Sequence, residues 1–254
     1  MINLIKTRIN HGYQAIKDVR AAQLGPLFRG LPEITAGSCP GECQKCLDVC
    51  PTAAITLNPV SIDMGKCIFC GECQNECPEK KIRFTSFHKI TTTAPEHLII
   101  DASVTAEAFS QKAITVNAQI KKIFKRSLKL REVSAGGCNG CEMELNACSN
   151  VNFDMQRFGI EFVASPRHAD GVVITGPITE NMAFALEETY RATPEPKILI
   201  LVGSCAISGG VFATSGALNR EFLSKHPVDI YVPGCPTHPL TFINGVLEYL
   251  DRKK

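Results

Sequence analysis

The feature that most constrains this chain is a pair of cysteine runs, each with four cysteines and each closed by a proline. The second run has the spacing C-x2-C-x2-C-x3-C-P, with which bacterial ferredoxins bind [4Fe-4S] clusters, and the first run has one residue more between its first two cysteines. The first run comprises Cys39, Cys43, Cys46 and Cys50, and the second comprises Cys67, Cys70, Cys73 and Cys77. Two such runs predict a module that holds two cubane clusters.

The spacing also predicts how the ligands divide between the two clusters. Three closely spaced thiolates hold three corners of a cubane, and in two-cluster ferredoxins the fourth cysteine of each run serves the other cluster. We therefore expect one cluster on Cys39, Cys43, Cys46 and Cys77, and the other on Cys67, Cys70, Cys73 and Cys50. Zinc also accepts four thiolates and is the competing interpretation, although zinc ribbons do not need two interleaved runs that end in proline.

The distribution of cysteines and turn signals predicts the domain organisation. From its second cysteine onward, the first run recurs as the second at an offset of 27 residues, which favours two short units related by pseudosymmetry. We expect an N-terminal amphipathic segment over residues 1–30, a two-cluster ferredoxin-like α+β domain over 31–90, a linker over 91–127 and a second domain over 128–254. The first segment, with Ile5, Ile9, Tyr13 and Ile16 at helical spacing, would lie on a membrane surface or a partner, or pack on its own domain.

The second domain alternates short aliphatic runs with helical segments. The runs lie at residues 128–133, 160–164, 172–175, 198–202 and 228–232, and the clearest helices at 180–192 and 239–250. Near-continuous apolar runs are typical of strands that are covered on both faces of a parallel sheet. We therefore expect an α/β fold with a doubly wound, flavodoxin-like parallel sheet.

Four further cysteines follow predicted strands of this second domain. Cys138 and Cys141 come after the first strand, Cys205 after the fourth and Cys235 after the fifth, all in glycine-rich segments. Because the carboxyl ends of parallel strands line one crevice, these thiolates should converge on a third [4Fe-4S] cluster. Ordinary buried thiols are the alternative. Cys148, the one left over from 13, is expected to be a core thiol.

Composition narrows the class of protein and its compartment. Many cysteines can also mean a secreted disulfide scaffold, but the beginning of the chain has no apolar core of signal-peptide length. The apolar runs fall far short of the roughly 20 residues of a membrane span. We expect a reduced, cytoplasmic protein, and the formal charge of only +2 argues against nucleic acid as a partner.

Short motifs distributed over both domains carry a family resemblance. They lie at residues 136–144 (GGCNGCEME), 157–160 (RFGI), 165–170 (SPRHAD), 176–179 (GPIT), 203–205 (GSC), 209–210 (GG) and 233–236 (PGCP). On these motifs the second domain resembles the small subunit of the group 4, membrane-bound, energy-converting [NiFe]-hydrogenases, the formate hydrogenlyase type in particular. It is similar as well to the cluster N2 subunit of complex I. The first domain, with FRGLP at 28–32, resembles the two-cluster ferredoxin subunit of the same complexes.

Two details favour the hydrogenase over complex I within this resemblance. Complex I subunits have adjacent cysteines where this chain has Cys138-x2-Cys141, and usually glutamine where it has His168. Two departures from the family are the fusion of two normally separate polypeptides and the absence of the extension that carries two more clusters in uptake hydrogenases. The fused ferredoxin module would replace that relay.

The resemblance implies partners and a location. The third cluster would be the proximal one, beside a nickel-iron centre held entirely by a separate large subunit. Further partners would be ferredoxin-type or donor subunits (formate dehydrogenase, carbon monoxide dehydrogenase or ferredoxin) and membrane-embedded antiporter-like subunits. The chain would then sit peripherally on the cytoplasmic side of the cell membrane.

Three other side chains come from the same resemblance. Glu144 is the candidate catalytic residue, which would face the large subunit and help to move protons, and Glu142 is a weaker candidate for the same role. Both are also acids of the kind favoured in the first turns of a helix. His168 would tune the proximal cluster by hydrogen bonding or simply cap a strand end.

These expectations add up to an oxidoreductase subunit that relays electrons through three [4Fe-4S] clusters between a low-potential donor and the nickel-iron large subunit for proton reduction to H2. The alternative is a relay subunit of a complex I-like oxidoreductase that reduces quinone or sulfur without nickel. A structural or sensing iron-sulfur protein and a free soluble ferredoxin are further alternatives, and the latter would not need residues 128–254.

Overall fold

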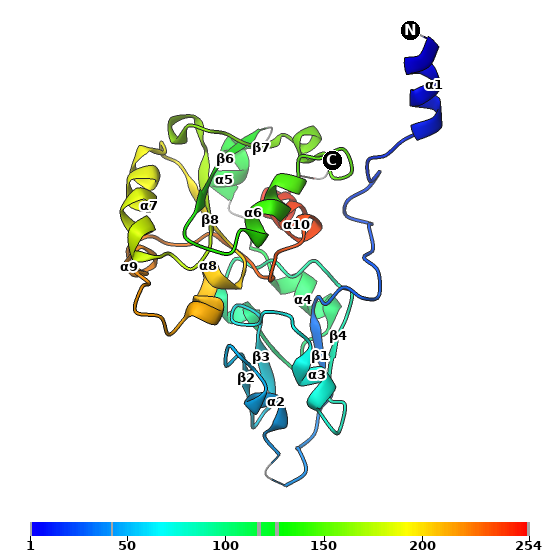
Figure 1. Ribbon diagram of the computed structural model, residues 1–254, viewed down its shortest axis with the longest axis vertical. Helices are drawn as coiled ribbons and strands as arrows, with labels where there is room; N and C mark the ends of the chain where they lie inside the picture. The colour runs from blue at the N-terminus through cyan, green and yellow to red at the C-terminus, as the bar shows by residue number, and fades with distance from the viewer. Residues whose placement is uncertain (1, 42, 116–117, 125–126, 253–254) are drawn as a thin grey trace.

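The structure is a computed structural model that describes residues 2–41, 43–115, 118–124 and 127–252. The part that follows residue 127 forms a layered α/β body, and the cysteine runs form a smaller body beneath it in the view of Figure 1. The expected linker over 91–127 includes residues 116, 117, 125 and 126, which lie outside the described residues.

A five-stranded parallel sheet organises the larger body. Its order is β10-β9-β8-β6-β7, and the strands are β6 (Leu128–Ser134), β7 (Ile160–Phe162), β8 (Gly171–Thr175), β9 (Ile198–Val202) and β10 (Ile230–Val232). The chain leaves β6 in one direction to β7 and then crosses back to β8, β9 and β10. This reversal of strand order confirms the doubly wound prediction and marks the edge where ligands bind in such sheets.

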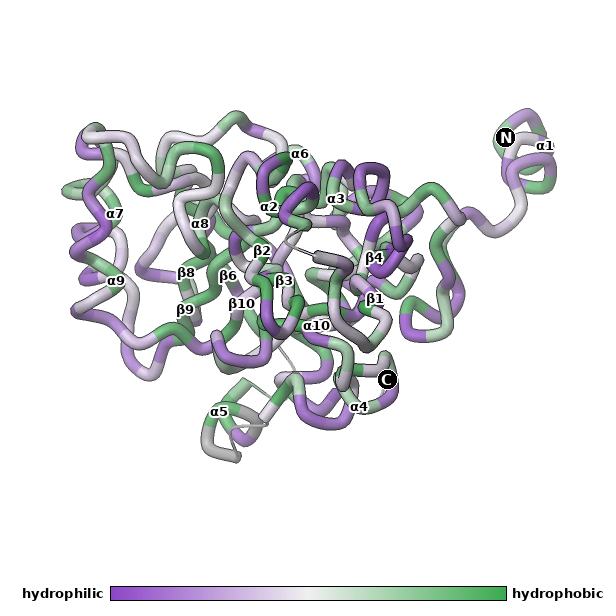
Figure 2. Tube along the Cα trace, turned by 90° about the horizontal axis from the view of Figure 1, so that it is seen from below, coloured by the Kyte–Doolittle hydropathy of each residue, from purple (hydrophilic) through white to green (hydrophobic). Residues whose placement is uncertain are grey.

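Helices cover both faces of the sheet because its strands are apolar on both sides. Val173, Ile198 and Ile200 belong to one core, with α6 (Gly140–Ala147) and α10 (Pro239–Tyr249), while Val172 and Leu199 belong to the other, with α7 (Glu180–Ala192) and α9 (Glu221–Lys225). The tube view shows these hydrophobic strands in the interior (Figure 2). The alternation along each strand follows the two-residue period of β structure.

The smaller body holds two short antiparallel sheets. β1 (Pro32–Ile34) pairs with β4 (Ile82–Phe84), and β2 (Ile55–Thr56) pairs with β3 (Ser61–Asp63), which also pairs with β5 (Ile99–Asp101). Two short helices, α2 (Lys45–Asp48) and α3 (Glu72–Glu76), carry cysteines of the two runs. We call this body the ferredoxin module.

The stretch expected as a linker is structured where it is described. It contains η1 (Pro95–Leu98), β5, α4 (Ala106–Lys112) and α5 (Ala118–Ile123). Ile100 of β5 is fully buried in the core of the ferredoxin module. The module therefore takes its third strand from residues beyond 90.

The N-terminal helix α1 (Ile2–His11) has no buried residue and projects away from both bodies (Figure 1). The residues after it return to the larger body: Val19 is buried in the core beneath α10, and the hydroxyl of Tyr13 accepts a hydrogen bond from Arg157 Nη1 at 3.2 Å. The sequence allowed α1 to pack on its own domain, and the structure contradicts this interpretation because α1 has no buried residue. Within the described ranges no helix has the length and apolar character needed to cross a bilayer.

Backbone pairing joins the two bodies. Thr92 and Tyr231 exchange two backbone hydrogen bonds of 2.8 and 3.0 Å, and Thr91 Oγ1 donates to Thr241 O at 3.1 Å. A β-carbon at Gly245 would lie only 2.4 Å from Thr91 Oγ1, so this close contact requires glycine. The ferredoxin module is thus fixed against β10 and α10.

Candidate metal centres

The four cysteines of the larger body gather at the carboxyl edge of the sheet. Cys138 lies in the loop after β6, Cys141 in α6, Cys205 in α8 (Ser204–Ser208) directly after β9, and Cys235 after β10. We call them the sheet-edge site. Their charges act on one another: burial raises the pKa of the Cys141 thiol to about 12, with Cys235 and Cys205 adding to the rise, and the pKa of Cys205 is raised to about 11 by burial and then by Cys235 and Cys138.

Glycine lets backbone approach the sulfur atoms of this site. Gly203 has φ +88°, and a β-carbon there would lie 2.4 Å from Cys141 Sγ. A β-carbon at Gly210 would lie 2.9 Å from Cys205 Sγ. The backbone N–H of Thr237 also bonds to the Cys141 sulfur, which favours the thiolate and so lowers the pKa of that thiol.

A second group, the inner site, comprises Cys50, Cys67, Cys70 and Cys73. Burial raises the pKa of both Cys67 and Cys73 to about 12, and in each case the thiols of Cys50 and Cys70 contribute to the rise. The backbone N–H of Phe69 donates to Cys67 Sγ and that of Ala54 donates to Cys50 Sγ, both at 3.3 Å. The first run thus contributes its fourth cysteine to this group, as the interleaved pattern predicts.

The remaining group, the outer site, comprises Cys39, Cys43, Cys46 and Cys77. The pKa of the Cys46 thiol is raised by burial, then by Cys77 and Cys39. The backbone N–H of Lys81 donates to Cys77 Sγ at 3.4 Å. Cys43 is half-buried just before α2, and its place in the group stays a prediction from the spacing.

The donor set of these sites fits [4Fe-4S] clusters. In the described part of the chain no three His, Cys, Asp or Glu side chains converge closely enough to hold a single metal ion. The ligands at each site are cysteine thiols, and backbone N–H groups donate to the sulfurs of Cys50, Cys67, Cys77 and Cys141. Thiolate ligands that also accept N–H···S hydrogen bonds are the environment in which proteins hold iron-sulfur clusters and tune their potentials.

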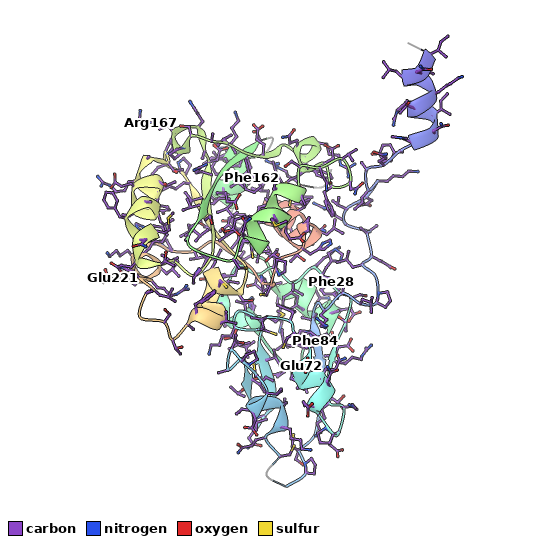
Figure 3. The ribbon with its side chains drawn as sticks, viewed as in Figure 1. Phe28, Glu72, Phe84, Phe162, Arg167 and Glu221 are labelled. Atoms are coloured by element: carbon purple, nitrogen blue, oxygen red, sulfur yellow. The ribbon has the colours of Figure 1, made fainter. Side chains whose placement is uncertain are left out.

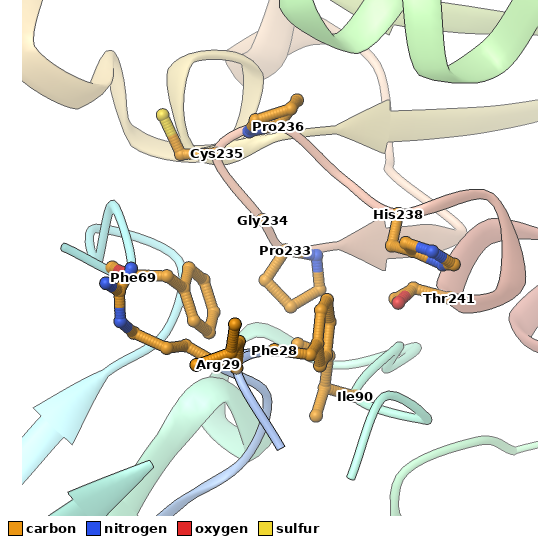
Figure 4. A pocket seen from close by; sticks show the side chains of 11 residues that line it. Phe28, Arg29, Phe69, Ile90, Pro233, Gly234, Cys235, Pro236, His238 and Thr241 are labelled. Atoms are coloured by element: carbon orange, nitrogen blue, oxygen red, sulfur yellow. The ribbon is translucent and has the colours of Figure 1, made fainter. Parts of the chain in front are cut away.

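The three sites follow one another without a break. Cys46 of the outer site and Cys73 of the inner site act electrostatically on each other, as do Cys70 of the inner site and Cys235 of the sheet-edge site. A cavity of ≈ 220 Å³ at the second junction is lined by Phe69, Arg29 and Cys235 among others (Figure 4). The inner site is therefore the middle one.

A buried hydroxyl crosses that second junction. Ser204, 1% exposed at the start of α8, donates from Oγ to Cys67 O at 2.5 Å, and Oγ also lies 3.2 Å from Gly234 O. Ser204 thus bonds to Cys67 of the inner site. It also precedes Cys205 directly in the chain and lies beside Gly234, the residue before Cys235, so it is next to two residues of the sheet-edge site. The sequence could not reveal this role, because the bonded residues are 137 positions apart.

Acidic side chains of α6 and β6 lie near the sheet-edge site, and Glu142 acts electrostatically on Cys141 and Cys205. Glu144 is half-buried in α6, and burial raises the pKa of its carboxyl. Glu142 Oε1 accepts hydrogen bonds from Ser134 Oγ at 2.6 Å and Thr175 Oγ1 at 2.8 Å, so this side chain is held inside the protein. Glu132, which the sequence did not single out, has a pKa raised to about 7 by burial and by Glu142.

Two other residues are placed clearly by the structure. Cys148 is fully buried beneath α10, with its Sγ donating to Glu144 O at 3.4 Å, which agrees with a core thiol. His168 ends η3 (Pro166–His168), next to Asp170, whose carboxylate accepts from the N–H of Lys129 at the beginning of β6. The cysteines lie at the other end of that strand, and Figure 3 shows Arg167 at the opposite side of the larger body from Phe28. A hydrogen bond from His168 to the sheet-edge site is therefore ruled out by position.

A fold of this kind, with its three thiol sites, defines an iron-sulfur protein that combines a ferredoxin module with a doubly wound sheet. Comparison with known families agrees: residues 138–249 match the family described as NADH ubiquinone oxidoreductase, 20 Kd subunit, and residues 38–89 match the 4Fe-4S dicluster domain.

Individual relatives point to the same family. The chain is 40% identical over 135 residues to the probable membrane-bound hydrogenase subunit mbhJ of Pyrococcus furiosus, a match that covers 53% of this chain and 81% of the relative. It is 40% identical to formate hydrogenlyase subunit 7 of Escherichia coli, over 52% of this chain and 51% of that protein. It is 41% identical to a NADH-quinone oxidoreductase subunit of Geotalea daltonii, over 44% and 65% respectively. The chain belongs to this family of oxidoreductase subunits, with a [4Fe-4S] dicluster domain in front.

Proposed function

We propose that this chain is the electron-transfer subunit of a membrane-associated [NiFe]-hydrogenase complex, with three [4Fe-4S] clusters as its carriers between a low-potential donor and a nickel-iron large subunit. The observation that carries the proposal is the uninterrupted order of the outer, inner and sheet-edge sites. The relatives named as membrane-bound hydrogenase and formate hydrogenlyase subunits support the choice of partner complex.

The chain's own residues have a geometric and electrostatic task in this scheme. When bound, the clusters supply one-electron carriers. The twelve cysteines, from Cys39 to Cys235 without Cys148, fix the carriers in a row, and burial of Cys67 and Cys73 limits the access of water to two of the inner-site thiols. Two electrons would serve each H2, formed with two protons on the partner subunit.

The sheet-edge site is the proposed contact with the large subunit. Cys138 and Cys235 are exposed, and so are three apolar side chains on the helices beside them, Met143 of α6 at 66% and Val211 and Phe212 of η4 (Gly210–Phe212). Exposed apolar groups around an exposed ligand set are typical of a surface that a partner covers. Glu144, on the same helix as Met143, would then take up or give a proton at that contact.

We propose that segments 1–30, 31–90, 91–127 and 128–254 differ in function, although β5 of the ferredoxin module lies within 91–127. The ferredoxin module would receive electrons at the outer site, from a ferredoxin-type or donor subunit. Antiporter-like membrane subunits would complete the complex. A peripheral position on the cytoplasmic side is supported by α1, which exposes Ile2, Leu4, Ile5 and Ile9 and carries Lys6 and Arg8 but no acidic residue.

Hydrogen evolution by the intact complex tests the proposal. The complex that contains this chain is purified without oxygen and assayed with reduced methyl viologen, and nickel and iron are measured in the same sample. Hydrogen evolution with nickel present, and about 12 irons per copy of this chain, is the expected result. No hydrogen and no nickel at full iron content would contradict the choice of partner.

A complex I-like relay is the second candidate function. The identity of 41% to a NADH-quinone oxidoreductase subunit supports it, because the same cysteines would serve there. The two candidates differ in the large subunit, which needs nickel-binding thiolates only in the hydrogenase. Reduction of a quinone or of sulfur by the nickel-free complex would decide for this alternative.

A further inference from the structure

Lys81 is a buried lysine at the outer site. It precedes β4, and only 9% of its surface is exposed. Its Nζ donates to Gly37 O at 2.8 Å and also to Ser38 O. The lysine thus bonds to the two carbonyls immediately before Cys39, although it lies more than 40 positions away along the chain.

The same residue also contacts the other end of the outer site. Its backbone N–H donates to Cys77 Sγ at 3.4 Å. Cys39 and Cys77 belong together in space, since both raise the pKa of Cys46. One residue therefore bonds to a sulfur ligand through its backbone and to the loop of a second ligand through its ammonium group.

Within the described residues, the Lys81 ammonium group bonds to carbonyls and not to an acid. Among the ion pairs of the described residues, none involves Lys81, whereas its carbonyl partners satisfy the ammonium hydrogen bonds without cancelling its charge. Burial weakens screening by water, so the charge acts more strongly on its neighbours. A cluster held by four thiolates becomes more negative on reduction, and a nearby cation favours that reduced state.

We propose that Lys81 is a positioning and potential-setting residue of the outer site: its ammonium group holds the Gly37–Ser38 turn that presents Cys39, and its buried charge favours the reduced state of the cluster there. This inference rests on the proposed function only in requiring a [4Fe-4S] cluster at the outer site. It does not depend on nickel, on hydrogen or on the identity of the partner.

Two further cations show that Lys81 is distinguished by burial. Arg29 Nη1 donates to Phe69 O in the loop of the inner site at 3.0 Å, but the arginine side chain is less buried. Lys80, the neighbour of Lys81, is exposed and donates to Asn75 O at 3.1 Å. Water screens the charges of exposed groups. Lys80 therefore provides a control with the same charge, one position away.

The test uses the full chain with its clusters, purified without oxygen. Lys81→Met removes the charge at nearly constant length, Lys81→Arg keeps the charge, and Lys80→Met removes the exposed neighbouring charge. Iron per chain is measured together with a redox titration followed by electron paramagnetic resonance. The signal of the outer site is identified as the one lost in Cys39→Ala.

We expect Lys81→Met to lower the equilibrium constant for reduction of the outer site by about tenfold. This corresponds to a midpoint potential lower by ~59 mV for one electron. Loss of about four irons per chain in Lys81→Met but not in Lys81→Arg would equally support the positioning role. Lys80→Met should leave both readouts unchanged.

Three results would overturn the inference. Lys81→Met could match Lys80→Met in iron content and potential, Lys81→Arg could lower the potential as much as Lys81→Met, or the shift could fall on the signals of the other sites. Any of these can occur in a complex that evolves hydrogen, and the expected result can occur in one that does not. Failure of this inference is therefore distinct from failure of the proposed function.

Discussion

Removal of the Ser204 hydroxyl should weaken the junction between the two bodies. Ser204→Ala deletes the donor that bonds to Cys67 O at 2.5 Å across this junction. Gly234 O, the second acceptor near this hydroxyl, keeps the backbone N–H of Ser204 as a donor at 3.0 Å. The substitution therefore leaves one buried carbonyl, that of Cys67, without its partner.

The size of the effect follows from that single carbonyl. A buried acceptor that loses its hydrogen bond costs about 1–3 kcal/mol of unfolding free energy. For a chain of this length each kcal/mol corresponds to a shift of about 2–4 °C in Tm. We therefore expect Ser204→Ala to lower Tm by about 2–12 °C.

Thermal unfolding of the cluster-loaded chain under anoxic conditions measures this loss. Ser224→Ala is the matched control, because Ser224 Oγ also donates to a carbonyl, Glu221 O at 2.7 Å, but at an exposed position of α9. Hydrogen exchange provides a second readout: the amides of Thr92 and Tyr231, which pair across the junction, should exchange faster in Ser204→Ala. If the two variants agree in Tm and in the exchange of these amides, the hydroxyl does not hold the bodies together.

Three further outcomes are expected. Cys235→Ser should lose about four irons per chain by iron assay, whereas Cys148→Ala should keep all of them, and equal iron loss in both would contradict the site assignment. Burial lowers the pKa of His88 to about 4, so below about pH 6.5 the unfolded chain binds a proton that the folded chain does not. The free energy of unfolding is therefore highest above pH 6.5 and falls by up to ~1.4 kcal/mol per pH unit between about 6.5 and 4. His88→Gln should reduce the difference in Tm between pH 5.5 and pH 7.5. Deletion of residues 2–11 should release the separately purified, cluster-loaded chain from anionic vesicles in a sedimentation assay, whereas full retention of the shortened chain would show that α1 is not the contact.

The sheet could be predicted from the sequence because its strands are local and strongly apolar. The observed bounds of β9 (Ile198–Val202) and α7 (Glu180–Ala192) are those expected, since one is a fully buried run and the other an amphipathic segment. The expected runs at 160–164 and 228–232 shorten to β7 and β10. These two strands are the edges of the sheet and have a neighbour on one side only, so their pairing ends earlier.

The structure of the expected linker could not be predicted because its signals are short. β5 has three residues, too few to show a period, and its partner β3 lies nearly 40 residues earlier in the chain, with Ser61 opposite Asp101. The strand exists because Ile100 fills the core of the ferredoxin module. Nothing within residues 99–101 distinguishes them from an exposed apolar turn.

The cysteine spacing indicated the kind of cofactor but not how its sites differ from one another. At each site a cation donates to carbonyls of the cysteine loop: Lys81 at the outer site, Arg29 at the inner site and Arg220 at the sheet-edge site, where it donates to Cys205 O among others. Lys81 is buried, whereas Arg220 and Arg29 are less so. Because screening by water decreases with burial, the three charges should act to different extents on their sites, and that of Arg220 acts directly on Cys205. The two cysteine runs have nearly the same spacing, so a difference in potential between the sites must come from such distant residues, which contact the loops only after the chain has folded.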